Sequence, residues 1–179
     1  MSMEYEFTCP PRVTNKNEKI YNWCMGFFKD KSIIKNVIRT VVKQDGCSYR
    51  YDLYDDDTKV YSIKRQIHQK DYDIGNYSIA EELETNWTSF YTENENDFVK
   101  VNRWEFIHVK IDGFDGTLRV SRFVETKPNI KNILKHKYKY KIEFEFENEP
   151  VETDICKIID LIKNGIEFEN CSVVDTKFY

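Results

Sequence analysis

Two stretches near opposite ends of the chain place carboxylates at every second position. They are Met3–Phe7, with the sequence MEYEF, and Tyr138–Glu147, with the sequence YKYKIEFEFE. Alternate side chains of a strand point to opposite faces, so each stretch gathers acids on one face and apolar residues on the other. Taken alone, such a strand also fits a sheet with one solvated face. If the two strands pair, however, their like charges repel unless a divalent cation or a cationic partner neutralises them.

Strand patterns dominate the chain between these acidic stretches. Apolar alternation predicts strands at Ile33–Val42, Tyr49–Tyr54, Val60–Ile67, Tyr77–Leu83, Val99–Ile111 and Leu118–Val124. Asp45-Gly46 predicts a hairpin between the first two, and the glycine-rich turn Asp112–Gly116 predicts another. The residues from Phe168 to Val174 are expected to add an edge strand, and about eight strands are expected in all.

Two helices are expected to flank the strands. The first begins near Thr14 or Asn15, and its core-facing stripe is predicted to contain Ile20, Trp23, Cys24, Phe27 and Phe28. The second begins at Pro150–Thr153 and ends at Gly165, with Ile155, Ile158, Ile159 and Ile162 at core spacing. Trp87–Asp97 and Pro128–His136 are predicted to be connections between elements.

Composition restricts the class of protein. The 179 residues predict a single domain, 1–179, and 31 acidic against 27 basic residues give a net charge of −4, which excludes a generally basic nucleic-acid coat. No apolar run approaches the roughly 20 residues that span a bilayer, and no signal peptide precedes the first strand, so a soluble intracellular protein without membrane contact is expected. The five cysteines include no CxxC pair, so neither a zinc site nor a redox motif is predicted.

Charges recur at regular places on the polar faces of the predicted strands. They are acidic on the first and last long strands and basic between them. An open antiparallel sheet with a solvated face explains this pattern, and so does a closed barrel with a polar interior and an apolar exterior covered by helices. Only the barrel gives the charges a common centre.

This order of motifs resembles the tunnel-type, metal-dependent RNA triphosphatases of viral and fungal mRNA capping, within the triphosphate tunnel metalloenzymes. Those enzymes carry an ExE strand near the N-terminus and a YELELE-like strand near the C-terminus, which EYEF and YKIEFEFE resemble here. The resemblance implies a mainly β (α+β) fold, a closed antiparallel eight-stranded tunnel barrel with flanking helices. It also implies hydrolysis of the γ-phosphate of RNA 5′-triphosphate ends, the first step of capping, together with nucleoside triphosphate hydrolysis.

The resemblance assigns roles to individual residues. The Mg²⁺ or Mn²⁺ ligands would be Glu4, Glu6, Glu143 and Glu145. The catalytic residues would be Glu81 or Glu82 as the water-orienting acid, with Lys64, Arg65 and Arg119. The substrate-binding residues would be Arg50, Arg103, His108, Lys110 and Lys141. A guanylyltransferase is the partner that the resemblance implies, and the location would be the nucleus, or the viral factory or virion for a viral protein.

Two departures and one competing motif bear on this interpretation. The segment Arg119–Phe123 reads RVSRF and lacks the Asp and Thr usual in the family, and EYEF lacks the Arg that commonly follows ExE. A triphosphate- or RNA-end-binding subunit without turnover is therefore the alternative hypothesis. Lys110–Gly113, KIDG, matches the KxDG motif of guanylyltransferases and ligases, but only 66 residues follow it, too few for that fold, and a β-turn explains Asp112-Gly113.

Overall fold

The computed structural model describes residues 2–11, 15–29, 35–44, 46–83, 100–125 and 138–174. The strands of these residues are β1 (Ser2–Cys9), β2 (Lys35–Gln44), β3 (Cys47–Tyr54), β4 (Lys59–Asp71), β5 (Asn76–Leu83), β6 (Lys100–Ile111), β7 (Gly116–Glu125), β8 (Lys139–Phe146) and β9 (Cys171–Val173). The helices are α1 (Asn15–Phe27), α2 (Glu152–Asn164) and the short 3-10 turn η5 (Phe168–Asn170).

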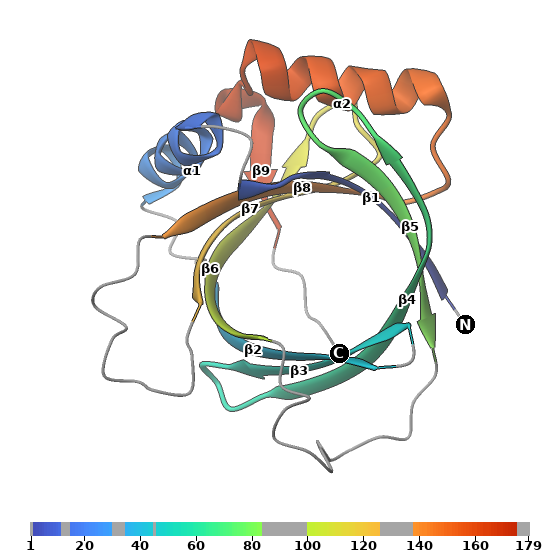
Figure 1. Cartoon of the computed structure of the whole chain (residues 1–179). Helices are drawn as coiled ribbons and strands as arrows, with labels where there is room; N and C mark the ends of the chain where they lie inside the picture. The colour runs from blue at the N-terminus through green and yellow to red at the C-terminus, as the bar shows by residue number, and fades with distance from the viewer. Residues whose placement is uncertain are drawn as a thin grey trace.

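The first eight strands form a closed antiparallel barrel, seen as a ring in Figure 1. The strand order is β2-β3-β4-β5-β1-β8-β7-β6, and pairing of β2 with β6, from Lys35 with Phe106 to Val41 with Lys100, completes the ring. β9 pairs antiparallel with the C-terminal end of β6, where Val109 lies opposite Val173 and Ile111 opposite Cys171. The closed barrel expected from the charge pattern is therefore confirmed, and the open sheet is excluded.

The predicted strands are present, with shifted ends. Tyr77–Leu83 lies in β5 as predicted, and the edge strand is the short β9. β4 runs four residues beyond its predicted end at Ile67, because a bulge there leaves Ile67 without a partner on β5 while the pairing continues. The connections predicted at Trp87–Asp97 and Pro128–His136 lie outside the described residues, as does the cap residue Thr14.

The main hydrophobic core lies outside the barrel, between its wall and the two helices. Phe7 of β1 and Ile142 and Phe144 of β8 are at most 1% exposed, and α2 packs its four isoleucines against the same cluster. Figure 1 shows α1 and α2 on the same side of the ring, over the wall that contains β1, β8 and β7. The apolar face of β8 therefore turns outward and its acidic face turns inward, as the alternation predicted.

The predicted core stripe of α1 is wrong at two positions. Trp23 and Phe27 are 60% and 49% exposed, whereas Ile20, Cys24 and Phe28 are buried. The buried stripe follows Asn17, whose amide donates hydrogen bonds to the carbonyls of Cys9, Pro10 and Tyr140 and so fixes the rotation of the helix against β1 and β8. Helical spacing permits a second apolar stripe on the neighbouring face, and Trp23 and Phe27 lie on it.

The ends of α2 match the sequence signals closely. The carboxylate of Asp154 accepts a hydrogen bond of 3.0 Å from the N–H of Val151 at the start, where the orphan donors of the helix lie. Gly165 ends the helix with φ 104°, and its N–H donates to the carbonyl of Leu161. That backbone conformation favours glycine, so the predicted stop is confirmed.

A second, smaller apolar cluster lies inside the barrel. Val37, Trp104, Phe106 and Phe123 form it, with Tyr54 packed against them. These residues alternate in sequence with outward-facing neighbours and share the inward face with Arg39, His108 and Arg119. The interior is therefore not uniformly polar: aromatic rings occupy the space beside β2, β6 and β7.

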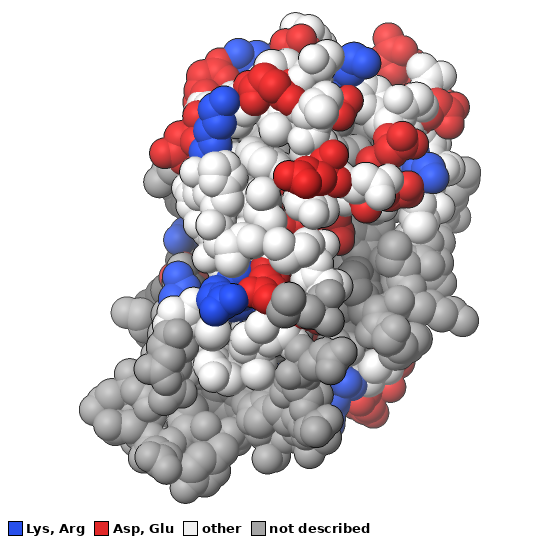
Figure 2. Space-filling model, turned by 90° about the vertical axis from the view of Figure 1, so that its right-hand side faces the viewer, with Lys and Arg blue, Asp and Glu red and all other residues white. Residues whose placement is uncertain are grey.

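The outer surface offers little attraction for a polyanion on the face shown in Figure 2. Asp and Glu, with fewer Lys and Arg among them, gather toward the upper part of this face, the level at which α2 lies in Figure 1, and a largely uncharged area lies below them at the left. Among the described residues no helix is long and apolar enough to cross a membrane.

Candidate active site

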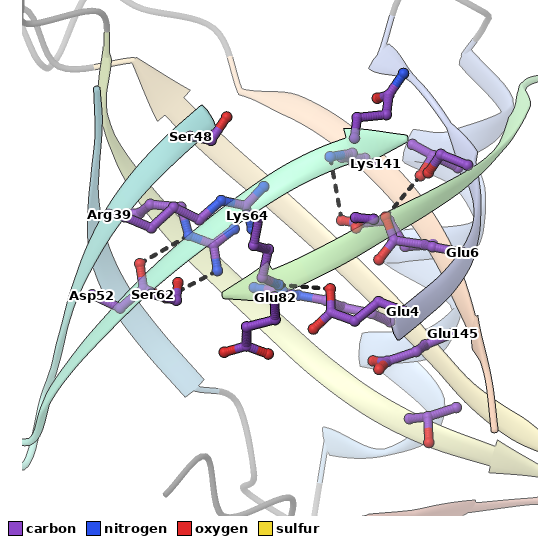
Figure 3. A pocket seen from close by; sticks show the side chains of 18 of the residues that line it. Glu4, Glu6, Arg39, Ser48, Asp52, Ser62, Lys64, Glu82, Lys141 and Glu145 are labelled. Atoms are coloured by element: carbon purple, nitrogen blue, oxygen red, sulfur yellow. Dashed lines mark hydrogen bonds and ion pairs between the residues drawn. The ribbon is translucent and has the colours of Figure 1, made fainter. Parts of the chain in front are cut away.

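The barrel encloses a cavity of about 690 Å³. Its ionisable lining residues come from all eight strands of the barrel and are Glu4, Glu6, Arg39, Arg50, Asp52, Tyr54, Lys64, Glu82, His108, Arg119, Lys141, Glu143 and Glu145. Figure 3 shows how the labelled side chains among them converge from opposite walls. Acids and bases that lie far apart in the sequence thus face one common space.

Glu6 and Glu143 share a hydrogen bond across the β1–β8 wall. Burial, together with the charge of Glu143, raises the pKa of Glu6 to about 8, and Thr8 donates a further hydrogen bond of 3.0 Å to its carboxyl. Burial also opposes ionisation of Glu143, but Lys141, at 3.5 Å, and Arg119 outweigh it, so the pKa of Glu143 falls below its usual range. At neutral pH the pair therefore holds one proton, on Glu6.

Glu4 and Glu145 lie next to this pair on the same inward faces. Glu4 accepts a hydrogen bond of 2.8 Å from the ammonium group of Lys64. Burial and then the charge of Glu4 raise the pKa of Glu145. The crowding of carboxylates predicted for two paired acidic strands is thus present, and it is relieved by one proton and two lysines.

Arg39 and Asp52 form a bidentate ion pair inside the cavity, with nitrogen–oxygen distances of 2.9 and 3.0 Å. Burial opposes both charges, but the pairing overrides it, raising the pKa of Arg39 and lowering that of Asp52. The pair fixes one guanidinium against the β2–β3 wall and leaves it neutralised.

Arg50 and Arg119 differ from the other cations of the cavity. Their Nε atoms are buried and have no hydrogen-bond partner among the described residues. Burial, and next the positive charge of Arg39, lower the pKa of both guanidinium groups. A buried donor without an acceptor is costly, so these two arginines fit a cavity that receives an anion.

The acidic side of the cavity fits a divalent cation in ligand chemistry. Carboxylate oxygens are the ligands that Mg²⁺ and Mn²⁺ prefer, and four of them, from Glu4, Glu6, Glu143 and Glu145, line one cavity. In the part of the chain that the structure describes, no three acidic, histidine or cysteine side chains are yet gathered closely enough to hold a metal ion. Ligation would need Glu6 to lose its proton and Lys64 to release Glu4.

Four of the residues expected in the site lie elsewhere. Arg65 and Glu81 face away from the cavity and pair with each other across β4 and β5. Consecutive residues of a strand point to opposite faces, so Lys64 and Glu82 face inward instead. Arg103 is exposed on the outer face of β6. Lys110 is exposed beyond the cavity, with its ammonium 3.9 Å from the carboxylate of Glu147.

Arg39 and Asp52 were not predicted as site residues, although the sequence contains a usable signal for them. The hairpin of β2 and β3 pairs Gln44 with Cys47, and counting outward from this pair brings Arg39 opposite Asp52. Opposite charges at directly paired positions attract each other. The register of the predicted hairpin would therefore have identified the pair.

The closed eight-stranded antiparallel barrel, with its cavity lined by ion pairs and helices on its outer wall, is a fold that this chain shares with solved structures of RNA triphosphatases. The solved structures that share this fold include the Mimivirus capping enzyme triphosphatase, with a TM-score of 0.62 and 11% identity over 93% of this chain and 90% of that one. They also include the S. pombe Pct1 RNA triphosphatase, with a TM-score of 0.55 and 12% identity over 90% of this chain and 75% of that one.

Pct1 in complex with the Spt5 CTD gives a TM-score of 0.53. No family profile and no curated protein sequence matches the chain. The relationship is thus one of fold, at a sequence identity too low to carry over the role of any residue.

Proposed function

We propose that this chain hydrolyses the γ-phosphate of RNA 5′-triphosphate ends in a reaction that depends on Mg²⁺ or Mn²⁺. One observation carries the proposal: the cavity places the hydrogen-bonded acids Glu6 and Glu143 in the same space as Arg50 and Arg119, whose buried Nε donors lack acceptors. A triphosphate that arrives with a divalent metal ion would supply what both sides need, since it would bring anionic oxygens to the arginines and a cation to the acids. Nucleoside triphosphates present the same groups and are proposed as further substrates.

The residues of the cavity suit this chemistry in distinct ways. Arg50 and Arg119 would bind the phosphate oxygens, on which charge develops as the bond to the γ-phosphate breaks, and Lys141 would add a third cation. Glu82 faces the cavity and would orient the attacking water, a role that Glu81 cannot fill from the outer face. Glu4, Glu6, Glu143 and Glu145 would hold the metal ion, which would polarise the γ-phosphate when bound.

The product would be a 5′-diphosphate RNA end and inorganic phosphate. A diphosphate end is the acceptor that a guanylyltransferase uses, so we propose such an enzyme as the functional partner.

A binding subunit without turnover is the second candidate. The observation that favours it is Ser121, which stands where the related enzymes usually have an aspartate. Its hydroxyl is fully buried and donates to the carbonyl of Lys141 at 3.1 Å, so it is bound to the barrel wall and offers no acid to the cavity.

Phosphate release separates the two candidates. The purified chain would be incubated with γ-labelled triphosphate RNA and with ATP, in chelator, Mg²⁺ or Mn²⁺, beside the variant Arg119→Ala. The proposal expects release only with a divalent ion and a loss of at least about a hundredfold in the variant. Binding of triphosphate RNA with the ion present, without release of phosphate, would instead establish the binding subunit.

A further inference from the structure

Four of the five Lys and Arg side chains that line the cavity are held in one of two ways. Lys64, Lys141 and Arg39 each lie within 3.5 Å of a carboxylate oxygen. Arg119 forms no ion pair with any described residue, and its guanidinium carbon instead lies 4.1 Å from the ring centroid of Phe106 and 5.7 Å from that of Trp104. Two aromatic rings therefore lie against Arg119, where a carboxylate lies against Lys64, Lys141 and Arg39.

Trp104 is the centre of this arrangement. Arg39 at 5.7 Å and Lys141 at 5.6 Å also approach its ring, so three cations from β2, β7 and β8 surround one indole. The ring is 4% exposed and stacks on Phe123 at 4.2 Å with an interplanar angle of 25°, and its buried Nε1 donor has no partner among the described residues. A ring packed in this way is fixed in position and can fix what lies against it.

An aromatic face attracts a cation through its quadrupole. Unlike a carboxylate, it takes up none of the N–H donors of the guanidinium and cancels none of its charge. We propose that Phe106 and Trp104 are positioning residues that hold Arg119 in place for the terminal phosphates of the ligand. The rings neither neutralise the charge of the guanidinium nor accept hydrogen bonds from its N–H groups. That the ligand is a triphosphate rests on the proposed function; the positioning itself rests on the contacts of the rings.

The first test compares two phenylalanines of the same cluster. Phe106→Leu removes the ring under Arg119, whereas Phe123→Leu removes a ring that packs on Trp104 and over which no described cation lies. Binding of inorganic tripolyphosphate in chelator would be measured by calorimetry, and thermal unfolding would measure the loss of packing. We expect Phe106→Leu to weaken binding about tenfold and Phe123→Leu less than about threefold, at similar losses of stability.

The second test leaves the cluster intact. In a chain carrying Trp23→Phe and Trp87→Phe, Trp104 is the remaining tryptophan. Its emission should change as tripolyphosphate saturates the cavity, because the cations around the ring move toward the anion.

A third test changes the ring of Trp104 itself. Trp104→Leu in the otherwise unmodified chain should weaken binding as Phe106→Leu does, and Trp104→Phe, which keeps a ring, should retain most of the affinity.

Equal loss of affinity in Phe106→Leu and Phe123→Leu would show that the cluster acts only through packing and would overturn the inference. A Trp104 emission that stays unchanged at saturating tripolyphosphate would also overturn it. Because binding is measured without turnover, the proposed function can fail separately. If the chain binds tripolyphosphate as expected but releases no phosphate from RNA, the positioning inference stands and the proposed hydrolysis is refuted. A chain that binds no tripolyphosphate in chelator loses the inference, and phosphate release with Mg²⁺ or Mn²⁺ then decides the proposed function by itself.

Discussion

Glu6 should destabilise the metal-free barrel as the pH rises, and Glu6→Gln should remove that effect. The pKa of Glu6 is about 8 in the folded chain against an ordinary value of 4.5, so between these values the folded state binds a proton that the unfolded state has lost. Stability therefore falls with rising pH across this window and levels off above about pH 8. Glutamine keeps the shape and can still donate a hydrogen bond to Glu143, but it does not titrate.

The size of the effect follows from the width of the window. Within this window the free energy of unfolding falls by about 1.36 kcal/mol for each pH unit. Relative to a pH below 4.5, Glu6 therefore lowers the stability by at most about 3 kcal/mol at pH 7. Between pH 5 and pH 8 the loss is about 4 kcal/mol. Urea unfolding in chelator, at several pH values, would measure the free energy of unfolding of both proteins. The gain of Glu6→Gln over the unmodified chain should grow as the pH rises.

Glu149→Gln serves as the control, because Glu149 is an exposed acid outside the cavity. Its difference from the unmodified chain should stay within about 0.5 kcal/mol at each pH. A gain of Glu6→Gln that is flat across the same range would refute the shared proton, and with it the account of how the acids coexist without a metal ion.

Three further outcomes are expected. Phe144→Ala should cost about 3–5 kcal/mol in urea unfolding, because the ring is 1% exposed, whereas Val151→Ala, at a site 64% exposed, should cost less than about 1 kcal/mol. Glu143→Gln should lower phosphate release by orders of magnitude and also destabilise the metal-free chain, since the fold favours the charged form of this acid; a gain in stability would contradict the pairing with Lys141. Asp52→Asn should cost about 3–5 kcal/mol at pH 7 by stranding a buried guanidinium. Because the pKa of Asp52 is lowered, that cost should shrink as the pH falls below about 3.8, and a cost independent of pH would argue against the ion pair.

Local patterns in the sequence were sufficient to predict faces and elements. The alternation in Tyr138–Glu147 correctly predicted that Phe144 faces a core and Glu143 the opposite side, because a strand repeats every two residues. The same rule shows why adjacent candidates could not be separated: of Lys64 and Arg65 only one can face the cavity, and the phase of the strand decides which. Because Lys64 and Arg65 are adjacent in the sequence, the pattern of charges did not show which of the two faces the cavity.

Features that depend on distant residues were not readable in the same way. Closure of the barrel requires Lys35–Val41 to pair with Lys100–Phe106, and no local signal joins these segments. The rotation of α1 depends on the hydrogen bond from the amide of Asn17 to the carbonyl of Tyr140. Because the helix has apolar residues on two faces, its spacing alone did not show that Trp23 is exposed. The cation-surrounded position of Trp104 likewise depends on three strands brought together only by the fold.

The bulge in β4 makes the barrel unequally tolerant of changes in chain length. Ile67 is an extra residue, and without it Gln66 and His68 would pair with Ala80 and Ile79 in regular succession, with Gln66 and Gln69 still facing the cavity. Loss of Ile67, which is 46% exposed, would thus leave every side chain of β4 on its present face. Loss of Ile63 would turn one half of the strand inside out and take Lys64 from Glu4. Homologous chains one residue shorter in β4 should therefore lack the residue at the bulge.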